Sequence, residues 1–497
     1  MIRSFIKNSS ILTTYTMIAI PLGYIVRLFY ANNLTVSEFG LFYALLNFFG
    51  FIGVFTDLGF SETQTYFLPR YLAKKEYHKV KAAIIASFIN KIVATLFMSV
   101  ILFFLSQFLS QSFFRSPQAF MALRLMILYW FLSNILTNLC ELFYSYRDAI
   151  IYGSTEVVRL SLTLCSIALF FYVLPNEKLH AVIWGWIAVY VVMFICYAVL
   201  FMKKHGSVFL SKKYSLVHIY KEFIPFLIPT ALRSGIQTLL NNSTVMILTY
   251  LRGVEAVALY NIAQPIANIL LLFITPLASL LLPVTIEFDV KKQHHKIKQI
   301  IRMILNVGVF VLVPFVLLLS LYSYEIIALL FKSVYTQASL LLKIAAFQIF
   351  IVIINNFIST IVSGFGIPKQ RAKIFGIAAV INILLSFVLI MLWDTQGAMV
   401  AGAVTYIFMV YSWIRLIRTK MEFSMPWNNY IRIIILACIF VVFHIYGGSF
   451  IHISNIYIKI SVVSLLSLML YFGIGIFAFN IVDMSFLKKL RIHSMKE

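Results

Sequence analysis

Arg233 lies deep inside a long apolar segment, and the same segment carries a regular row of polar side chains. The row consists of Thr230, Ser234, Gln237 and Asn241, at steps of four, three and four residues, with Asn242 beside it. These steps place the side chains on one face of a helix. A guanidinium offers fixed paired donors that match the oxygens of an anionic group. No acidic residue stands close to Arg233 in the sequence, so we expect an unpaired arginine in the wall of a hydrated, anion-binding cavity.

Two further apolar segments repeat this polar pattern. The first carries Asn261, Gln264 and Asn268, and the second carries Asn355, Asn356, Ser359 and Ser363. Amide and hydroxyl groups in membrane helices commonly hydrogen-bond between helices and hold a bundle together. Holding the bundle together is therefore the alternative to lining a cavity. Three such rows, one of them with an arginine, favour side chains that line a cavity.

Three other basic residues lie within apolar segments. Arg27 and Lys91 are near segment ends, where long side chains can reach the lipid head groups, although Arg27 is also a candidate second anion-binding residue. Arg159 follows Glu156 by three residues, and Glu141 lies in the preceding segment, so we expect a structural ion pair there.

Enzyme motifs are scarce in this sequence. It contains no G-x-S-x-G, no H-E-x-x-H and no G-x-x-x-x-G-K-[ST] pattern. Glu287 and Asp289 have the spacing of a metal-binding carboxylate pair in a lipid-linked-sugar transferase, but they run directly into Lys291 and Lys292. We therefore expect no catalytic residue, no bound metal and no cofactor, and the chain is not expected to be an enzyme.

The elements that position these residues are expected to be transmembrane helices. Of the 497 residues, 62% are hydrophobic and 11% are charged, whereas ordinary soluble domains are roughly a quarter charged. A hydrocarbon core of ~30 Å needs about 20 apolar residues in a helix. On this measure the expected spans are 10–31, 39–60, 82–108, 119–145, 149–174, 180–202, 222–250, 257–284, 300–321, 343–363, 373–393, 397–417, 429–447 and 457–480.

Basic residues gather in alternate loops of this arrangement. Most of the 40 Lys and Arg residues lie on the side that also carries both termini, and few lie on the other. Because cytoplasmic loops collect Lys and Arg, both termini are expected in the cytoplasm, in a multi-pass protein of the cytoplasmic (inner) membrane. The asymmetry accounts for most of the net charge of +23, so we expect contact with membrane lipids and none with nucleic acid.

The spans divide into two halves of six, followed by two more. At an offset of 218 residues, Val36 aligns with Val254, Leu41 with Leu259, Phe42 with Tyr260 and Phe55 with Phe273. Both halves begin and end on the same side, which predicts a parallel repeat. The expected organisation is one six-helix bundle in residues 1–210, a second in 211–420, and two extra helices with a cytoplasmic tail in 421–497.

The segment NNLTVSEFGLFYALLNFFGFIGVFTDLGF resembles the polysaccharide-exporter branch of the multidrug/oligosaccharidyl-lipid/polysaccharide exporter superfamily. Glu38, Gly40 and Phe42, followed by Asp57-Leu58-Gly59, match the first-repeat pattern of that family, with Glu38, Asp57 and Gly59 as its structural motif. FIPFLIPTALRSG and NNSTVMILTYLRGVEAVALYNIAQPI are similar to its seventh and eighth helices. The resemblance implies an all-α fold of two six-helix bundles in pseudo-two-fold arrangement, with two additional helices.

In function, the resemblance implies a flippase that moves a prenyl-(di)phosphate-linked oligosaccharide across the membrane by alternating access, for cell-surface polysaccharide or glycan assembly. Arg233 and Arg27 would then bind the phosphate, and the amide rows would bind sugar. A polysaccharide polymerase or ligase is a candidate partner, and a monomer is expected. The alternatives are a cation-coupled multidrug exporter of the same superfamily, or a membrane glycosyltransferase or ligase, for which the outer loops are short.

The ion that drives transport is the point at which the chain departs from this family. Many relatives carry an Asp near the position of Asn241 and Asn242, and an amide cannot carry a proton or anchor a cation as a carboxylate does. Asn382, Ser386 and Thr405 resemble part of the sodium site of lipid II flippases. Coupling to Na⁺ or to H⁺ therefore stays open from the sequence.

Overall fold

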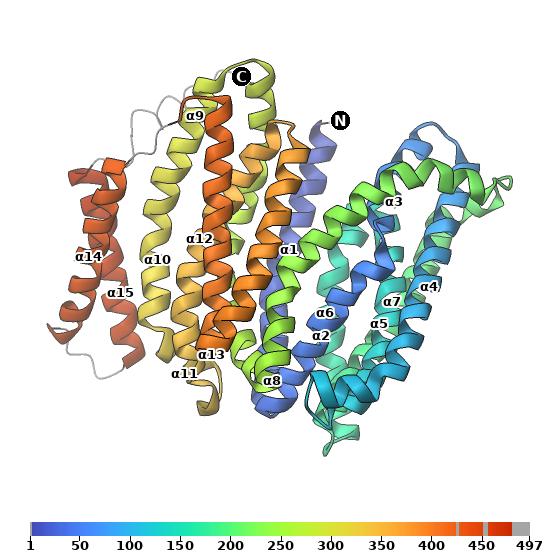
Figure 1. Cartoon of the computed structure of the whole chain (residues 1–497), viewed down its shortest axis with the longest axis horizontal. Coiled ribbons are helices and arrows are strands. Elements are labelled where there is room, and N and C mark those ends of the chain that lie inside the picture. Colours follow the sequence, from blue (N-terminus) through green and yellow to red (C-terminus); the bar gives the residue numbers. More distant parts are fainter. Residues whose placement is uncertain (1, 424–426, 451–455, 480–497) are drawn as a thin grey trace. The chain divides into compact units, whose positions relative to one another are not determined.

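The computed structural model describes residues 2–423, 427–450 and 456–479, which are almost entirely helical and contain no strand (Figure 1). The expectation of an all-α membrane protein is therefore confirmed. The helices are α1 (Ile2–Asn33), α2 (Val36–Asp57), α3 (Phe60–Ala73), α4 (Tyr77–Phe108), α5 (Ala119–Ser145), α6 (Ala149–Val173), α7 (Lys178–His205), α8 (Leu216–Val290), α9 (His294–Met303), α10 (Val309–Leu321), α11 (Ser323–Leu330), α12 (Ala338–Gly364), α13 (Pro368–Lys420), α14 (Trp427–Phe450) and α15 (Ile456–Gly473). Short turns of other helix types follow several of them, including a π-helical turn at Leu109–Phe113 after α4.

By length and composition, twelve helical segments of the described ranges could cross a membrane. Two of the twelve are interrupted by non-helical backbone, α8 at Gly253 and α13 at Trp393 and Asp394. Dividing each of these at its interruption gives fourteen apolar crossings, the number that the hydropathy pattern predicts.

The chain forms two compact units. Unit 1 comprises the described residues up to Ile262, together with Ala328–Thr336 and Phe375–Ala398. Within it α1 packs against α6, α7 packs against α5 and α6, and α4 packs against α5. Helices α2 and α3 both contact α4 and α5. Unit 1 therefore contains the first six predicted spans and also the part of α8 that carries Arg233.

Unit 2 comprises Ala263–Ile327, Gln337–Ile374 and the described residues from Met399 onward. Here α10 packs against α12 and α14, and α14 packs against α15. Phe310, Leu436, Phe440 and Tyr471 form the buried core that joins the last two helices to α10. The boundaries at residues 210 and 420 stay predictions, and the predicted cytoplasmic tail falls largely on residues 480–497, outside the described ranges.

The second predicted span ends earlier than expected. Helix α2 stops at Asp57, because Leu58 (φ 47°) and Gly59 (φ 80°) adopt left-handed backbone conformations, and α3 then begins as a separate helix. A Cβ atom on Gly59 would lie 2.5 Å from Thr230 Oγ1 of α8. Glycine is thus required both by the turn and by the close approach of α8. The sequence pattern left the residues after 60 in the loop before the span at 82–108, so the helix at Phe60–Ala73 was not predicted.

The predicted internal repeat has a counterpart in the helix boundaries. Helix α2 begins at Val36, where Thr35 and Glu38 form a reciprocal cap, and the second part of α8 begins at the aligned Val254, directly after Gly253. A Cβ on Gly40 would lie 1.9 Å from the Val254 carbonyl oxygen and 3.1 Å from Ala258 Cβ. Gly40 and Ala258 are themselves aligned positions, so the two repeats meet at equivalent residues within unit 1.

Candidate substrate-binding and ion-binding residues

Helix α8 presents an exposed polar row in unit 1. Arg233, Gln237 and Asn241, each four residues apart, are all exposed. Gln237 Nε2 donates to Asn241 Oδ1 over 3.4 Å, so the amide groups of the row contact each other. An arginine and two amides on one exposed face of a membrane-spanning helix are unfavourable against lipid, and they favour contact with water or a polar ligand.

Arg233 is not unpaired, contrary to the expectation from the sequence. Its Nη2 forms an ion pair with Glu62 Oε1 of α3, yet 69% of the arginine side chain stays exposed. The partner was missed because Glu62 lies 171 residues earlier in the chain and in a segment read as a loop. An exposed guanidinium with one internal carboxylate partner can still bind a second anion or exchange its partner.

The other polar residues near this row bond to their own helix. Thr230 Oγ1 donates to the carbonyl oxygens of Phe226 and Leu227 and is buried under Gly59, so it does not belong to the exposed row. Ser234 and Asn242 likewise donate to carbonyl oxygens three and four residues earlier. The exposed row is therefore narrower than the sequence pattern predicted.

Arg27 and Asn261, two predicted binding residues far apart in sequence, come together in unit 1. Arg27 Nη1 donates to the Asn261 carbonyl oxygen over 2.5 Å, and its guanidinium carbon lies 4.2 Å from the centre of the Tyr43 ring. The Asn261 side chain is buried and donates to the Val257 carbonyl oxygen. Arg27 thus contacts α2 and α8 directly.

The predicted polar residues of unit 2 differ in exposure and in hydrogen-bond partners. Gln264 Nε2 donates to Asn268 Oδ1 over 3.2 Å, and Asn268 is exposed. Asn355 is instead buried, and its Oδ1 accepts a hydrogen bond from Trp413 Nε1 over 2.9 Å, which joins α12 to α13. Its neighbour Asn356 is half-buried, and its carbonyl oxygen accepts two hydroxyl groups of the next turn. For Asn355 the interhelical role, left open by the sequence, is the one observed.

The carboxylate pair at the end of α8 contacts basic residues. Glu287 pairs with Lys291, and Asp289 lies 3.9 Å from His294. The hydrogen bond from Lys291 lowers the pKa of the Glu287 carboxyl below its ordinary value. These pairs agree with a solvated, charged helix end rather than with a transferase metal site.

A charged cluster that the sequence did not predict lies where α2, α3 and α4 meet. Lys91 Nζ binds Asp57 Oδ1 over 2.8 Å, and only 5% of Lys91 is exposed. The expectation that Lys91 reaches the head groups was therefore wrong, because the half-buried Asp57 carboxylate binds its ammonium group. Ser61 also donates to Asp57, and Glu141 of α5 lies beside this pair.

The ion pair expected for Arg159 is confirmed. Its guanidinium bonds to both carboxylate oxygens of Glu156, one turn earlier on α6. Glu141, the other candidate partner, belongs instead to the neighbourhood of Asp57 and Lys91. Glu141 is thereby left without a cation of its own.

A second, uncharged cluster joins α8 to α13 in unit 1. Asn382 Oδ1 accepts hydrogen bonds from Ser243 Oγ (3.1 Å) and Thr244 Oγ1 (3.0 Å), and Thr244 Oγ1 lies 3.1 Å from Ser386 Oγ. All four side chains are buried. Two of the three predicted cation-site residues, Asn382 and Ser386, thus come together, with hydroxyls that follow Asn242 in sequence. The third, Thr405, belongs to unit 2.

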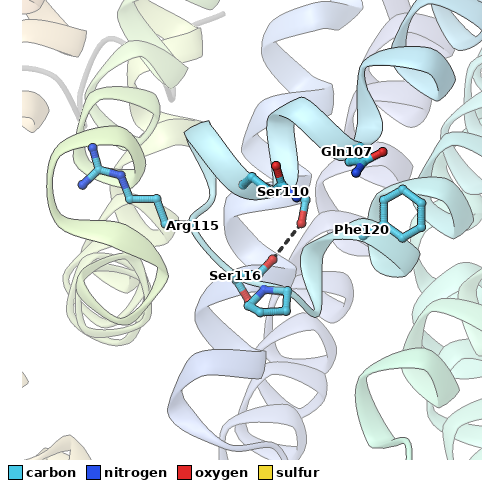
Figure 2. A pocket seen from close by; sticks show the side chains of 7 residues that line it. Gln107, Ser110, Arg115, Ser116 and Phe120 are labelled. Carbon is cyan, nitrogen blue, oxygen red and sulfur yellow. Dashed lines mark hydrogen bonds between the residues drawn. The ribbon is translucent and has the colours of Figure 1, made fainter.

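A pocket of about 570 Å³ lies at the end of α4 and the start of α5, on the predicted outer side. Figure 2 shows the hydrogen bond from the Ser110 hydroxyl to the Ser116 carbonyl oxygen, and Gln107 and Phe120, which also line the pocket. Arg115, in a left-handed conformation (φ 51°), points away from these residues, and its guanidinium carbon lies 5.5 Å from the Tyr250 ring of α8. None of the predicted binding residues lines this pocket.

Family comparisons match most of the chain. The model described as "Polysaccharide biosynthesis protein" matches residues 5–289, and the MatE model matches residues 229–388. An uncharacterized membrane protein of Methanocaldococcus jannaschii is 24% identical over 489 residues, 94% of each chain. A probable low-salt glycan biosynthesis flippase of Haloferax volcanii, Agl15, is 25% identical over 150 residues, 30% of this chain and 32% of that one.

Solved structures share the fold at low sequence identity. The lipid II flippase MurJ, in an inward closed conformation, has a TM-score of 0.73 and 14% identity, covering 94% of this chain and 99% of its own. An inward-facing multidrug resistance transporter of the MATE family has a TM-score of 0.67 and 13% identity, covering 84% and 97%. The chain is therefore a multi-pass membrane protein with the fold of these transporters.

Proposed function

Because the chain belongs to the polysaccharide biosynthesis protein family, we propose that it is a flippase for a prenyl-(di)phosphate-linked oligosaccharide. It would move the lipid-linked glycan across the cell membrane by alternating access, for the assembly of a surface polysaccharide or glycan. The protein would act as a monomeric transporter rather than as an enzyme, with both termini in the cytoplasm. A polymerase or ligase would then use the translocated glycan.

The exposed row of Arg233, Gln237 and Asn241 is the observation that carries this proposal. A lipid-linked oligosaccharide presents a phosphate and many hydroxyl groups, and these are the partners that a guanidinium and carboxamides bind. A row of this kind is costly to maintain in a membrane-spanning helix unless it has such a function.

Each part of the substrate has a candidate partner in the chain. Arg233 would bind the phosphate, because its side chain is largely exposed and has one internal carboxylate partner. Arg27, which packs on Tyr43, would add a second positive charge. Gln237, Asn241, Gln264 and Asn268 would bind sugar hydroxyl groups, whereas Asn355 is engaged with Trp413 and would hold its helices in place.

The similarity of part of the chain to a glycan biosynthesis flippase supports this substrate class. A second candidate, a cation-coupled multidrug exporter, is favoured by the MatE match over residues 229–388. The two differ in substrate charge, since a lipid-linked phosphate is an anion. An arginine in the exposed row favours the anion.

The test is flipping of a fluorescent prenyl-diphosphate-linked glycan by the purified chain in liposomes. A hydrogen bond to a charged group contributes about 1.5–3 kcal/mol, so Arg233→Ala should lower flipping by roughly tenfold to a hundredfold. Arg233→Lys should lower it as well, because an ammonium group cannot reproduce the paired donors. Arg418→Ala, which removes an exposed arginine in the last turn of α13, is the matched control.

Full flipping by both Arg233 variants would contradict the phosphate-binding role. Export of cationic drugs with no flipping of the glycan would favour the multidrug exporter instead. Western blots of the membrane fraction must show each variant at the level of the unaltered chain.

A further inference from the structure

Glu141 lies beside the ion pair of Asp57 and Lys91, in the part of unit 1 where α2, α3, α4 and α5 contact each other. The Ser61 hydroxyl donates to Asp57 Oδ1 and is also within hydrogen-bonding reach of the Glu141 carboxylate. The other carboxylate oxygen, Glu141 Oε2, is shielded from solvent and has no hydrogen-bond partner among the described residues. A shielded acceptor without a donor is unfavourable, so this oxygen needs a hydrogen that the ionised carboxylate lacks.

The charges of this cluster do not balance when every group is ionised. Asp57 and Glu141 carry two negative charges, and Lys91 carries one positive charge. An uncompensated charge inside a membrane-spanning bundle is costly. One proton on Glu141 makes the cluster neutral and gives the carboxyl group an O–H donor of its own.

Among the described residues, the neighbouring helices supply no second cation for Glu141. Besides Asp57 and Lys91, the titratable groups facing this region of α5 are Glu62 of α3, Tyr152 of α6, and Tyr197 of α7, which faces the adjacent Cys140. Arg233 of α8 is paired with Glu62. Among the residues that the structure describes, Lys91 is thus the cation facing Glu141, and it already binds Asp57.

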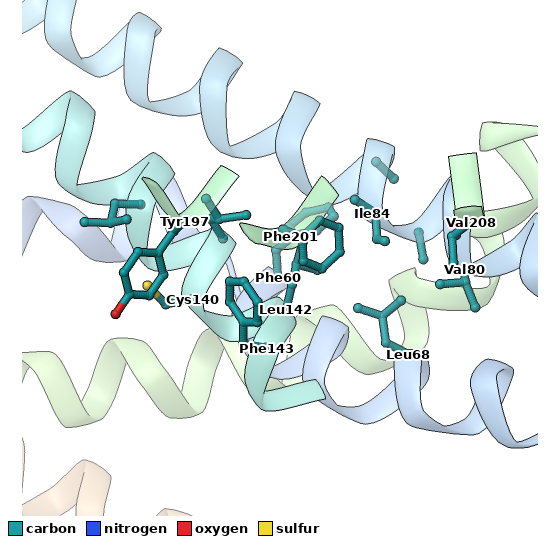
Figure 3. Packing of buried hydrophobic residues seen from close by; sticks show 14 of the residues in the cluster. Phe60, Leu68, Val80, Ile84, Cys140, Leu142, Phe143, Tyr197, Phe201 and Val208 are labelled. Atoms are coloured by element: carbon teal, nitrogen blue, oxygen red, sulfur yellow. The ribbon is translucent and has the colours of Figure 1, made fainter. Parts of the chain in front are cut away.

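Apolar packing encloses the cluster on the side of α4, α5 and α7. Phe60 and Cys140, the sequence neighbours of Ser61 and Glu141, belong to a buried core that also contains Phe143 and Phe201 (Figure 3). Such surroundings favour the neutral form of a carboxyl group over the charged form.

Two consecutive residues of α3 connect this cluster to the exposed row of α8. Ser61 donates to Asp57, and Glu62 pairs with Arg233. Helix α3 also contacts α8 at Gly59, where a Cβ would lie 2.8 Å from the Ala231 backbone nitrogen, and at Tyr71, whose hydroxyl lies 2.6 Å from Glu222 Oε2. A small movement of the first turn of α3 would therefore change both the carboxylate cluster and the partner of Arg233.

We propose that Glu141 is a proton-binding site whose occupancy decides, through Ser61 and Glu62, whether Arg233 is available to bind an anion. The proton comes from a hydronium ion of the surrounding water, which loses one O–H bond as the carboxylate gains one, and no other covalent bond changes. With Glu141 protonated, Ser61 stays on Asp57 and Glu62 stays on Arg233, as observed. With Glu141 ionised, its charge attracts the Ser61 hydroxyl and repels the Glu62 carboxylate, which releases Arg233.

It follows that a proton on Glu141 and a phosphate on Arg233 oppose each other's binding. A phosphate on Arg233 replaces Glu62, and a proton on Glu141 restores Glu62, so each ligand weakens the binding of the other by the same factor. This part of the inference rests on the proposed function, whereas the proton site itself does not. Together they describe a transporter that exchanges protons for an anionic lipid.

The proton site is tested by infrared difference spectra of the full-length protein in lipid nanodiscs as the pH is changed. The unaltered chain should show a protonated-carboxyl band that disappears as pH rises, and Glu141→Gln should lack it. Glu156→Gln, which alters a carboxylate paired with Arg159, should retain the band. If Glu141→Gln does not fold, Glu141→Asp keeps a carboxylic acid and should show a shifted band.

The coupling is tested by binding of a short-chain prenyl diphosphate over the same pH range. Binding by the unaltered chain should strengthen as pH rises, by up to about tenfold per pH unit for one linked proton. Glu141→Gln should bind weakly at every pH, and Glu62→Gln should bind tightly at every pH. Any titration of the ligand itself affects binding to Glu156→Gln and to the unaltered chain equally. Binding by Glu156→Gln should therefore show the same pH dependence as binding by the unaltered chain.

Each result bears on a different part of the proposal. An infrared titration that is the same in the unaltered chain and Glu141→Gln overturns the proton site. Loss of the band in Glu141→Gln with an unchanged pH dependence of binding overturns the coupling. If no variant binds prenyl diphosphate at any pH, the proposed phosphate-binding role fails, while the infrared spectra still decide whether Glu141 takes a proton.

Discussion

Unit 1 contains two polar clusters between its helices, and they differ in charge and in burial. One is built from Asp57, Lys91 and Glu141 around the α2–α3 turn, and the other joins Ser243 and Thr244 of α8 to Asn382 and Ser386 of α13. The first is the site at which we propose that a proton binds. The second offers neutral oxygens, which satisfy one another by hydrogen bonds and hold a cation less strongly than carboxylates do.

The difference in charge is the basis on which we distinguish a proposed proton site from a packing contact. Charged groups are retained inside a membrane bundle at high cost, so a cluster with unbalanced charge points to a function that uses it. Hydroxyl and amide groups are common between membrane helices and contribute modest stability. We therefore propose proton binding at Glu141, beside the α2–α3 turn, and helix packing for the cluster between α8 and α13.

The largest expected effect comes from breaking the charged cluster at Lys91. Lys91→Met leaves Asp57 and Glu141 without their cation; removing one partner of a fully buried ion pair costs about 3–5 kcal/mol, and the partial exposure of Asp57 places this change toward the lower end. A thermal or steric-trapping assay of unfolding, in detergent or lipid, would measure this loss of stability. Lys291→Met, which removes an exposed lysine paired with Glu287, should leave the unfolding transition unchanged. Equal stability of the two variants would show that the Asp57 pair is not buried as described.

Gly59→Ala should disturb the same cluster through its backbone. The residue has φ 80°, and the added Cβ would meet Thr230 Oγ1 and the Ala231 nitrogen. Overpacking of this kind costs about 1–3 kcal/mol, with a further penalty for the left-handed conformation. The proton titration of the cluster should change as well.

Gly53→Ala is the matched control for this change, because Gly53 lies within α2 and a Cβ there meets no atom within 4 Å. It should be neutral or slightly stabilising, since alanine is the better helix former. If Gly53→Ala destabilises the protein as much as Gly59→Ala does, the close approach of α8 to Gly59 is not the cause.

The smallest effect is expected in the uncharged cluster. Ser386→Ala removes one hydroxyl contact to Thr244, and a typical hydrogen bond contributes about 0.5–1.5 kcal/mol. The variant should keep its pH response and its transport, because no titratable group is lost. Ser412→Ala serves as the control, because the Ser412 hydroxyl donates only within its own helix, to the Phe408 carbonyl oxygen. Loss of transport in Ser386→Ala alone would move ion coupling to this cluster.

Local sequence was sufficient for features whose partners lie within one helical turn. The reciprocal cap of Thr35 and Glu38 and the pair of Glu156 and Arg159 have partners three residues apart. Helical spacing also identified the row of Gln237 and Asn241, because that row needs no knowledge of another helix. Features of this kind depend on backbone geometry that every α-helix shares.

Local sequence was not sufficient where the partner comes from another helix. Lys91 has the same apolar flanks as a residue that reaches the head groups, and nothing near it indicates Asp57. Arg233 looked unpaired because Glu62 precedes it by 171 residues. Helix α3 was missed because its start depends on a left-handed turn at Leu58 and Gly59 that fits closely under α8.

The sequence by itself determined that this protein is an all-helical membrane protein with fourteen apolar crossings and a polar face on the seventh. Each of these is a property of a window of about 20 residues, because transfer into lipid depends on local composition. Only the tertiary structure decided which charges meet. A buried charge takes its partner from whichever helix lies within a few ångströms, and proximity between helices is set by packing across the whole unit rather than by order along the chain.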